Sequence, residues 1–214
     1  MKRKIHIFFL LSLPLFSIST DKFIEEYKKI SAEKLKLPNA YSLGAKDPTL
    51  NIVEFFDYLC PYCAEVSTEL KSFAQENTNT VKLVLMNLPL DKECNTMVTN
   101  DIHPGACKLS YAAYCASEQN KFLEFHEQLF SLQMYFNVVT PEKISKLAKS
   151  LKLNMPKFQN CQTSEEAKIF VKKQIETAIE NNIRQTPTVF INNKRLKMIP
   201  NKDILMSLLQ HESF

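Results

Sequence analysis

The chain has 214 residues, of which 45% are hydrophobic and 23% charged, which suits one globular domain, with or without an insert, and excludes a disordered chain. Its formal net charge of +4 falls to +1 when the three basic residues at positions 2–4 are set aside. We therefore expect no nucleic acid as a partner, because phosphate binding requires a concentrated basic face.

Residues 1–19, MKRKIHIFFLLSLPLFSIS, have the pattern of a secretory signal peptide. A basic start, an apolar stretch and small residues follow one another, and cleavage is expected near Ser19 or Thr20. An uncleaved membrane anchor is the alternative, but the apolar run is short and Pro14 interrupts it. We therefore expect a mature domain of residues 20–214 that is periplasmic or otherwise extracytoplasmic.

The first half of that domain predicts two strands with a helix between them. Segments 51–58 and 81–90 are rich in β-branched and aromatic residues, as buried strands are. The helix between them begins at Pro61, and an amphipathic helix capped by Asp21 precedes the first strand. The loop at 40–50 has room for a short edge strand.

The second half predicts a block of helices, a hairpin and a last helix. The periodicity places helices at 103–119, 121–133, 140–151, 164–182 and 201–209, and hairpin strands at 186–192 and 194–199. The sequence LNMP at 153–156 is typical of a turn. This order predicts an α/β fold whose core is 50–90 and 184–214, with a helical insertion at about 91–183.

Cys60 and Cys63 follow the first predicted strand as a Cys-x-x-Cys pair. Such a pair can be half of a metal site, a structural staple or a reactive dithiol. A zinc site needs four ligands, and the chain has no second pair of this spacing. A staple across so short a loop removes little unfolded-state entropy. We therefore expect a reactive dithiol that uses no metal and no cofactor.

The predicted helix assigns different roles to the two sulfurs. Cys60 lies where the helix begins, so that free N–H groups and the helix dipole stabilise its thiolate. Cys63 lies one turn inside, partly buried and in reach to resolve a mixed disulfide. We expect Cys60 to be the exposed nucleophile and Cys63 the resolving thiol.

Two segments resemble a known family. VEFFDYLCPYC, 53–63, is similar to the active-site segment of the DsbA-like branch of the thioredoxin fold, and RQTPTVFINNKRL, 184–196, resembles its cis-proline segment. The order of elements is similar over nearly all of 21–214. The resemblance implies a thioredoxin fold with a helical insertion between the second strand and the cis-proline hairpin, and a thiol–disulfide oxidoreductase.

The resemblance also implies what individual residues do. Pro61 and Tyr62 tune the Cys60 thiolate, and Pro187 is cis beside the dithiol, with Thr186 offering backbone groups to a substrate segment. Glu54 matches a buried acid that relays the proton of the resolving sulfur. The alternative for Glu54 is a carboxylate that faces solvent.

The chain departs from the family's pattern at two positions. Gln185 stands where a Gly commonly precedes the Thr-Pro pair, and Tyr62 stands where strongly oxidising members often have His. The direction of electron transfer therefore stays open.

Segments PLDKECN, HPGAC and CASEQNKFLEFHEQLF are similar to a bacterial subgroup of the family. Some of its members are fused to, or paired with, quinone-reducing partners like vitamin K epoxide reductase. The resemblance implies reduced or unfolded exported proteins as substrates and a quinone-linked membrane partner that reoxidises the dithiol. A monomer is expected, with a dimer contact through the first helix as the alternative.

The remaining four cysteines are expected to form two disulfides in an exported protein. If residues 107–115 are one helix, Cys107 and Cys115 lie about 12 Å apart, too far to pair. Cys94 pairs with Cys107 and Cys115 with Cys161, or Cys94 with Cys115 and Cys107 with Cys161. We favour the first, because Cys94 and Cys107 flank one short loop. Four free thiols are the alternative.

His103 and His126 are candidates for a metal ligand or a general base. We expect His103 to cap a helix beside Pro104, and His126 to be a structural residue on an apolar helix face.

Three functions stay open. The first is an extracytoplasmic oxidase that introduces disulfides into exported proteins. The second is an isomerase or reductase on the same fold, and the third is a chaperone or binding module without redox activity. A copper chaperone lacks an evident third soft ligand.

Overall fold

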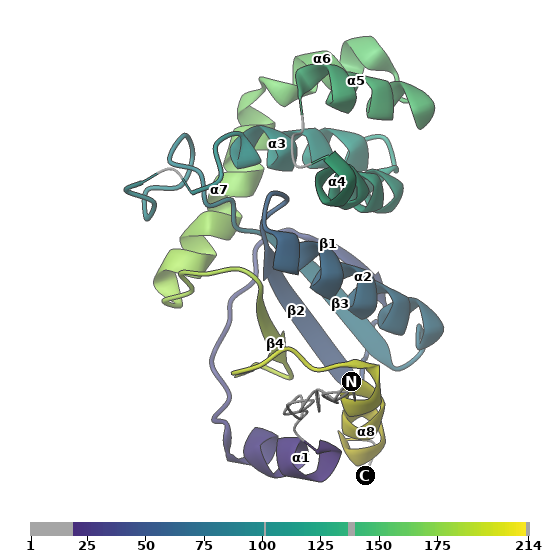
Figure 1. The fold of residues 1–214 in the computed structure, drawn as a ribbon, viewed down its shortest axis with the longest axis vertical. Helices are drawn as coiled ribbons and strands as arrows, with labels where there is room; N and C mark the ends of the chain where they lie inside the picture. Colours follow the sequence, from purple (N-terminus) through teal and green to yellow (C-terminus); the bar gives the residue numbers. More distant parts are fainter. Residues whose placement is uncertain (1–18, 101, 137–139, 213–214) are drawn as a thin grey trace, which may run out of the picture.

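A computed structural model describes residues 19–100, 102–136 and 140–212 of the chain. Nearly all of the expected signal peptide lies outside them. The described residues contain a five-stranded mixed sheet with the strand order β1-β3-β2-β4-β5 (Figure 1). The strands are β1 (Tyr41–Gly44), β2 (Leu50–Phe56), β3 (Val81–Asn87), β4 (Thr188–Ile191) and β5 (Lys194–Arg195).

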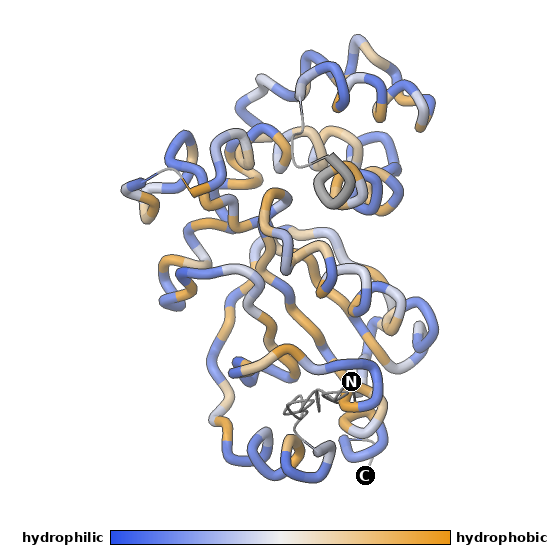
Figure 2. The backbone as a smooth tube through the Cα atoms, viewed as in Figure 1, coloured by the Kyte–Doolittle hydropathy of each residue, from blue (hydrophilic) through white to orange (hydrophobic). Residues whose placement is uncertain are grey.

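Strand β2 is central because its side chains suit burial on both faces. Six of its seven residues, LNIVEFF, are buried. It pairs in parallel with β3 and antiparallel with β4, while β1 pairs antiparallel with the outer side of β3. Figure 2 shows the apolar residues concentrated along these strands. The two predicted central strands are thus present, and the edge strand lies in the loop before residue 50.

The described part of the chain also contains eight helices. They are α1 (Thr20–Lys29), α2 (Pro61–Glu76), α3 (Ala106–Ser117), α4 (Phe122–Phe136), α5 (Pro141–Ser150), α6 (Met155–Gln162), α7 (Glu165–Glu180) and α8 (Lys202–Glu212). Helices α3 to α7 lie between β3 and β4 in the sequence, so the fold is the predicted α/β thioredoxin fold with a helical insertion. Helices α3 to α6 gather beyond one end of the sheet, and α1 and α8 lie together near the other end (Figure 1).

The sheet has an apolar core on each face. On one face Ile52 and Leu83 pack with residues of α2, such as Leu70, in a core that continues into the helical insertion. On the other face Val53 and Phe190 pack with residues that include Ala178 of α7 and a few from the segment before β1. Because β2 contributes to both cores, its position is fixed from both sides.

Four local predictions were wrong or incomplete. Helix α1 is capped by Ser19, whose side chain accepts from the N–H of Lys22, rather than by Asp21. The segment LNMP begins helix α6 instead of forming a turn, because the side chain of Asn154 caps it and a proline occupies its first turn. Strand β5 has two residues where 194–199 was predicted, and α8 extends to Glu212.

The insertion is held by two disulfides. Cys94 joins Cys107 at the start of α3, and Cys115 of α3 joins Cys161 of α6. This is the first of the two pairings that the sequence allowed. Each bond closes a loop of different length, 13 residues for the first and 46 for the second. Cys60 and Cys63 are free thiols in this structure.

The loop lengths predict different contributions to stability. Replacing Cys115 and Cys161 by Ala is expected to lower the free energy of unfolding by about 4 kcal/mol, and replacing Cys94 and Cys107 by about 3 kcal/mol, because the longer loop loses more unfolded-state entropy. Urea unfolding of the two double variants beside the parent protein measures this. A larger loss from the Cys94–Cys107 pair would contradict the loop-entropy explanation.

Candidate active site

The Cys-x-x-Cys pair lies in the turn that leaves the central strand. Cys60 immediately precedes α2, and its N–H donates to the carbonyl oxygen of Asp57 at 3.1 Å. No side chain caps this helix, and Pro61 in its first turn has no N–H. The free N–H groups of the first turn and the helix dipole therefore favour a negative charge at the Cys60 sulfur.

The two cysteines differ in exposure less than the sequence predicted. Cys63 is fully buried, and Cys60 is only 5% exposed. The expectation of an exposed Cys60 was therefore wrong in degree. The segment before Pro187 covers this cysteine, because its Sγ lies 3.5 Å from the carbonyl oxygen of Thr186.

The surroundings move the pKa values of the two thiols in opposite directions. Hydrogen bonding from the Cys63 side chain is the main cause that lowers the pKa of Cys60 to about 6, and the Cys63 backbone and Thr186 also contribute. Burial and the charge of Asp57 oppose this shift. The pKa of Cys63 is strongly raised by its burial, by its hydrogen bond to Cys60 and by the nearby charge of Glu54. Near neutral pH the pair therefore holds one thiolate and one thiol.

The sheet register brings Thr186 and Pro187 to this turn from the far end of the sequence. Strand β4 pairs with β2 so that Thr188 lies opposite Phe55 and Val189 opposite Glu54. The residues just before β4 consequently meet the residues just after β2. The peptide bond between Thr186 and Pro187 is cis, as the resemblance implied.

Glu54 faces the interior. It is fully buried on β2, and both of its carboxylate oxygens accept from the hydroxyl group of Ser67 at 2.8 Å. Burial is the main cause that raises the pKa of Glu54 to about 8, the charge of Cys60 adds to it, and Ser67 opposes it. The solvent-facing alternative is thus wrong. Ser67 was not singled out, although it lies one helical turn beyond Cys63 on α2.

Asp57 and His103 form a contact that the sequence did not predict. Nδ1 of His103 lies 2.9 Å from Oδ2 of Asp57, whose side chain is completely buried. His103 does not cap α3, because Gly105 occupies the cap position. The only sequence signal was the placement of Asp57 and His103 after two neighbouring strands.

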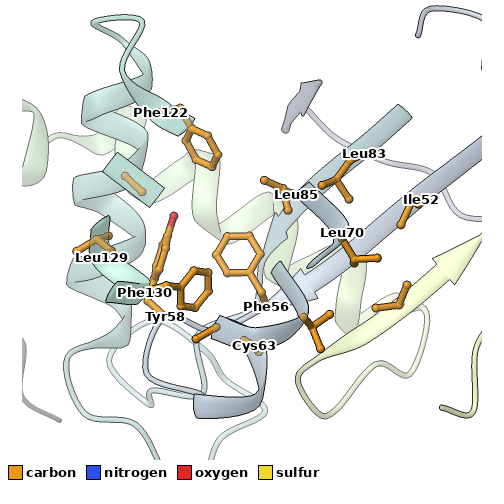
Figure 3. Close-up of a cluster of buried hydrophobic side chains, with 14 of the residues drawn as sticks. Ile52, Phe56, Tyr58, Cys63, Leu70, Leu83, Leu85, Phe122, Leu129 and Phe130 are labelled. Atoms are coloured by element: carbon orange, nitrogen blue, oxygen red, sulfur yellow. The ribbon is translucent and has the colours of Figure 1, made fainter. Parts of the chain in front are cut away.

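His126 lies in an aromatic cluster with Phe56, Tyr58, Phe122 and Phe130. Its Nδ1 lies 2.9 Å from the hydroxyl oxygen of Tyr58, within hydrogen-bond distance, and burial lowers the pKa of His126 to about 3. The imidazole is therefore neutral and structural, as predicted. Figure 3 shows Cys63 beside Phe56 and Tyr58 at the edge of this cluster.

A groove of about 700 Å³ runs beside Tyr62, which is 71% exposed, and the segment of Thr186 and Pro187. Its lining mixes acidic side chains of α2 with basic ones from the segments around β4 and β5: Glu65, Glu69, Arg184, Arg195 and Lys197. The groove borders the dithiol through Tyr62, Thr186 and Pro187, which lie beside Cys60 in the sequence or in space. Within the described residues, no group of His, Cys, Asp and Glu side chains is placed to hold a metal ion.

The chain matches a family model described as "Thioredoxin" over residues 36–210, which include every strand of the sheet and the reactive turn. The chain belongs to this thioredoxin family. The match covers well over half of the chain, and it spans the insertion as well as both parts of the sheet.

Particular relatives place the chain within the family. It is 25% identical over 176 residues to "Disulfide bond formation protein D" of Bacillus subtilis, covering 79% of this chain and 75% of that protein. The structure of the "thiol-disulfide exchange protein alpha-DsbA2" of Wolbachia pipientis superposes with a TM-score of 0.68 at 14% identity, covering 90% and 95% of the two chains. The resemblance to the DsbA-like branch is thus confirmed, and the vitamin K epoxide reductase-like partner stays a prediction.

Other relatives are much longer than this chain. It is 26% identical over 152 residues to "Na(+)/H(+) antiporter NhaA 3" of Salinispora tropica, which is 71% of this chain but 21% of that protein. The chain therefore spans about a fifth of the length of the first curated relatives that it matches.

The buried carboxyl group predicts a pH-dependent stability difference. Because the folded pKa of Glu54 is about 8, the folded protein keeps a proton that the unfolded chain loses above its ordinary pKa of about 4.3. The contribution of Glu54 to stability should therefore fall as the pH rises between these values. For reduced Glu54→Gln, we expect the unfolding free energy of the variant minus that of the reduced parent to rise by about 2–4 kcal/mol from about pH 5 to pH 8.

Urea unfolding of both proteins across this pH range measures the difference. A difference that stays constant with pH would show that Glu54 does not hold a proton in the folded protein.

Proposed function

We propose that the protein is an extracytoplasmic thiol–disulfide oxidoreductase that introduces disulfides into exported proteins through Cys60 and Cys63. The observation that carries this proposal is the unlike protonation of the two sulfurs. Cys60 has its pKa lowered to about 6, while burial keeps Cys63 protonated. A stabilised Cys60 thiolate is a good leaving group, and it favours the reduced form of the dithiol over its disulfide.

The reaction transfers two electrons from the substrate to the Cys60–Cys63 disulfide. A substrate thiolate attacks the Cys60 sulfur, the bond between the two cysteines breaks, and Cys63 leaves and takes up a proton. A second substrate thiolate then attacks the substrate sulfur of the mixed disulfide and releases Cys60 as a thiolate. The substrate gains one disulfide, and the protein gains one thiolate and one thiol.

The neighbouring residues support both steps. Glu54, with a pKa raised to about 8, is protonated near neutral pH and supplies the proton that Cys63 takes up as it leaves. Thr186 and Pro187 hold the substrate segment along the groove beside the dithiol. Pro61 directly follows Cys60 at the start of α2 and tunes its thiolate, and exposed Tyr62 meets the substrate at the entrance.

The proposed location and partners rest on the first residues of the sequence and on the family resemblance. The pattern of residues 1–19 directs the chain out of the cytoplasm, and residues 20–214 form the mature unit. In the part of the chain that the structure describes, no helix is long and apolar enough to cross a membrane. In this proposal a separate quinone-linked membrane protein reoxidises the dithiol, as the family resemblance implies, and the protein acts as a monomer.

An isomerase or reductase is the second candidate, because a Cys60 pKa of about 6 is nearer to that of a reductant than to that of a strong oxidant. Thioredoxin, a reductant, has a nucleophile pKa of about 7, while the strong oxidant DsbA has one of about 3.5. One pKa unit below thioredoxin corresponds to about 1.4 kcal/mol, or about 30 mV for two electrons. The thiolate of Cys60 alone therefore accounts for a potential of about −240 mV, which lies between those of thioredoxin and the glutaredoxins.

We expect the equilibrium of the protein with glutathione to give a potential between about −240 and −180 mV, and thus above the −270 mV of thioredoxin. Alkylation followed by mass spectrometry reads the fraction of the Cys60–Cys63 disulfide in each buffer. A potential at or below about −270 mV would contradict net oxidation of substrates.

Activity on a reduced and on a scrambled substrate separates the remaining candidates. An oxidase forms bonds in the reduced substrate, whereas an isomerase also restores the scrambled one. Cys60→Ser should abolish both activities, and Ser at this position would leave a purely binding protein active.

A further inference from the structure

The side chain of Asp57 accepts hydrogen bonds from three parts of the chain. Its Oδ1 accepts from the N–H of Leu59 at 2.6 Å, and its Oδ2 accepts from the N–H of Leu90 at 2.6 Å and from His103. Its side chain is completely buried, and its carbonyl oxygen receives the N–H of Cys60. The Asp57 side chain thus accepts from three N–H donors, three positions before the reactive sulfur in the turn.

This carboxylate is unfavourable for the chemistry of the turn. Its negative charge opposes the thiolate of Cys60 and raises the pKa of that thiol. A negative charge near Cys60 disfavours the thiolate that the start of helix α2 otherwise stabilises, unless a positive charge balances it. His103 is the titratable cationic side chain that contacts Asp57 in the described structure.

His103 is held in place by the loop that joins β3 to α3. Its N–H donates to the carbonyl oxygen of Leu90 at 3.0 Å. Farther along the loop, Oδ2 of Asp91 accepts from the N–H groups of Gly105 and Cys107, and the disulfide from Cys107 to Cys94 closes the same loop. The imidazole is one-fifth exposed, so it exchanges protons with solvent while its Nδ1 stays on Asp57.

We propose that His103 is a positioning residue that acts on Cys60 through Asp57: when protonated, it pairs with the carboxylate and removes the repulsion that Asp57 exerts on the thiolate. The inference rests on the proposed function, because it requires Cys60 to react as a thiolate. The proposal adds His103, which lies at the start of the insertion 43 positions after Cys60, to the residues that control the reactivity of Cys60.

The charges around the imidazole agree with this role. The hydrogen bond to Asp57 is the first cause that raises the pKa of His103, burial opposes it, and the charges of Asp57 and Cys60 add to the rise. Asp57 and Cys60 face His103, and Cys60 is also faced by Cys63 and by Glu54, whose pKa it helps to raise. An interaction between two titrating groups is reciprocal, so a thiolate that favours the imidazolium is itself favoured by it.

Reciprocity gives a test that needs no substitution. NMR titration of the His103 ring should show a higher pKa in the reduced protein than in the form with the Cys60–Cys63 disulfide, because only the reduced protein carries the thiolate. His211, exposed near the end of α8, is the internal control. Equal values for His103 in the two forms would overturn the inference.

Two substitutions separate charge from packing. In reduced His103→Gln, we expect the thiolate absorbance of Cys60 to titrate about 0.5 pH unit or more above the parent, which means a thiolate fraction about threefold lower at mildly acidic pH. His103→Lys restores a positive charge and should return the titration toward the parent value. His211→Gln is the matched control and should leave it unchanged.

The outcomes distinguish this inference from the proposed function. If the parent shows no Cys60 thiolate at mildly acidic pH, the proposed function fails. If the parent shows it and the Gln variant titrates identically, only the inference fails. Equal shifts in the Gln and Lys variants would show a packing role and would also overturn it. Should either variant fail to fold, the NMR titration of the parent decides alone.

Discussion

The chemistry of the site depends on the burial of one sulfur beside another at the start of a helix. Cys63 is fully buried at the edge of the aromatic cluster of Phe56 and Tyr58, so its ionisation is strongly disfavoured and it stays a hydrogen-bond donor (Figure 3). That donor is the main reason why the neighbouring Cys60 ionises more easily. The core therefore determines the reactivity of the turn, because an exposed Cys63 would ionise more easily and would be a weaker guarantee of the hydrogen bond to Cys60.

The central strand places every other part of the site around this pair. Glu54 lies on β2 with its side chain in the interior, and Asp57 and Cys60 follow the carboxyl end of this strand. Its pairing with β4 brings Thr186 to the Cys60 sulfur, and the end of β3 leads to the loop that carries His103. Because β2 is fixed by apolar packing on both faces, these groups hold their positions.

The parts that could be predicted are those that short sequence patterns determine. The strand, turn and helix around Cys60 followed from a β-rich run and Pro61. The length of a single helix excluded a bond between Cys107 and Cys115, and the short loop between Cys94 and Cys107 favoured the pairing that the structure has. The contact of Asp57 with His103 joins residues 46 positions apart through two loops, and no periodic pattern encodes such a contact. The same limit applies to the burial of Cys60, which comes from Thr186, and to helix α6, whose Asn154 cap resembles a turn.

The central claim is that Cys60 ionises at a pH well below the ordinary pKa of a cysteine thiol, while Cys63 stays protonated. Reaction of the reduced protein with iodoacetamide across a pH series, with each cysteine quantified by peptide mass spectrometry, tests it most directly. The account predicts that labelling of Cys60 rises with a midpoint near pH 6, while Cys63 stays unlabelled in the folded protein. A midpoint near the ordinary cysteine value of about 8.5, or faster labelling of Cys63, would contradict it.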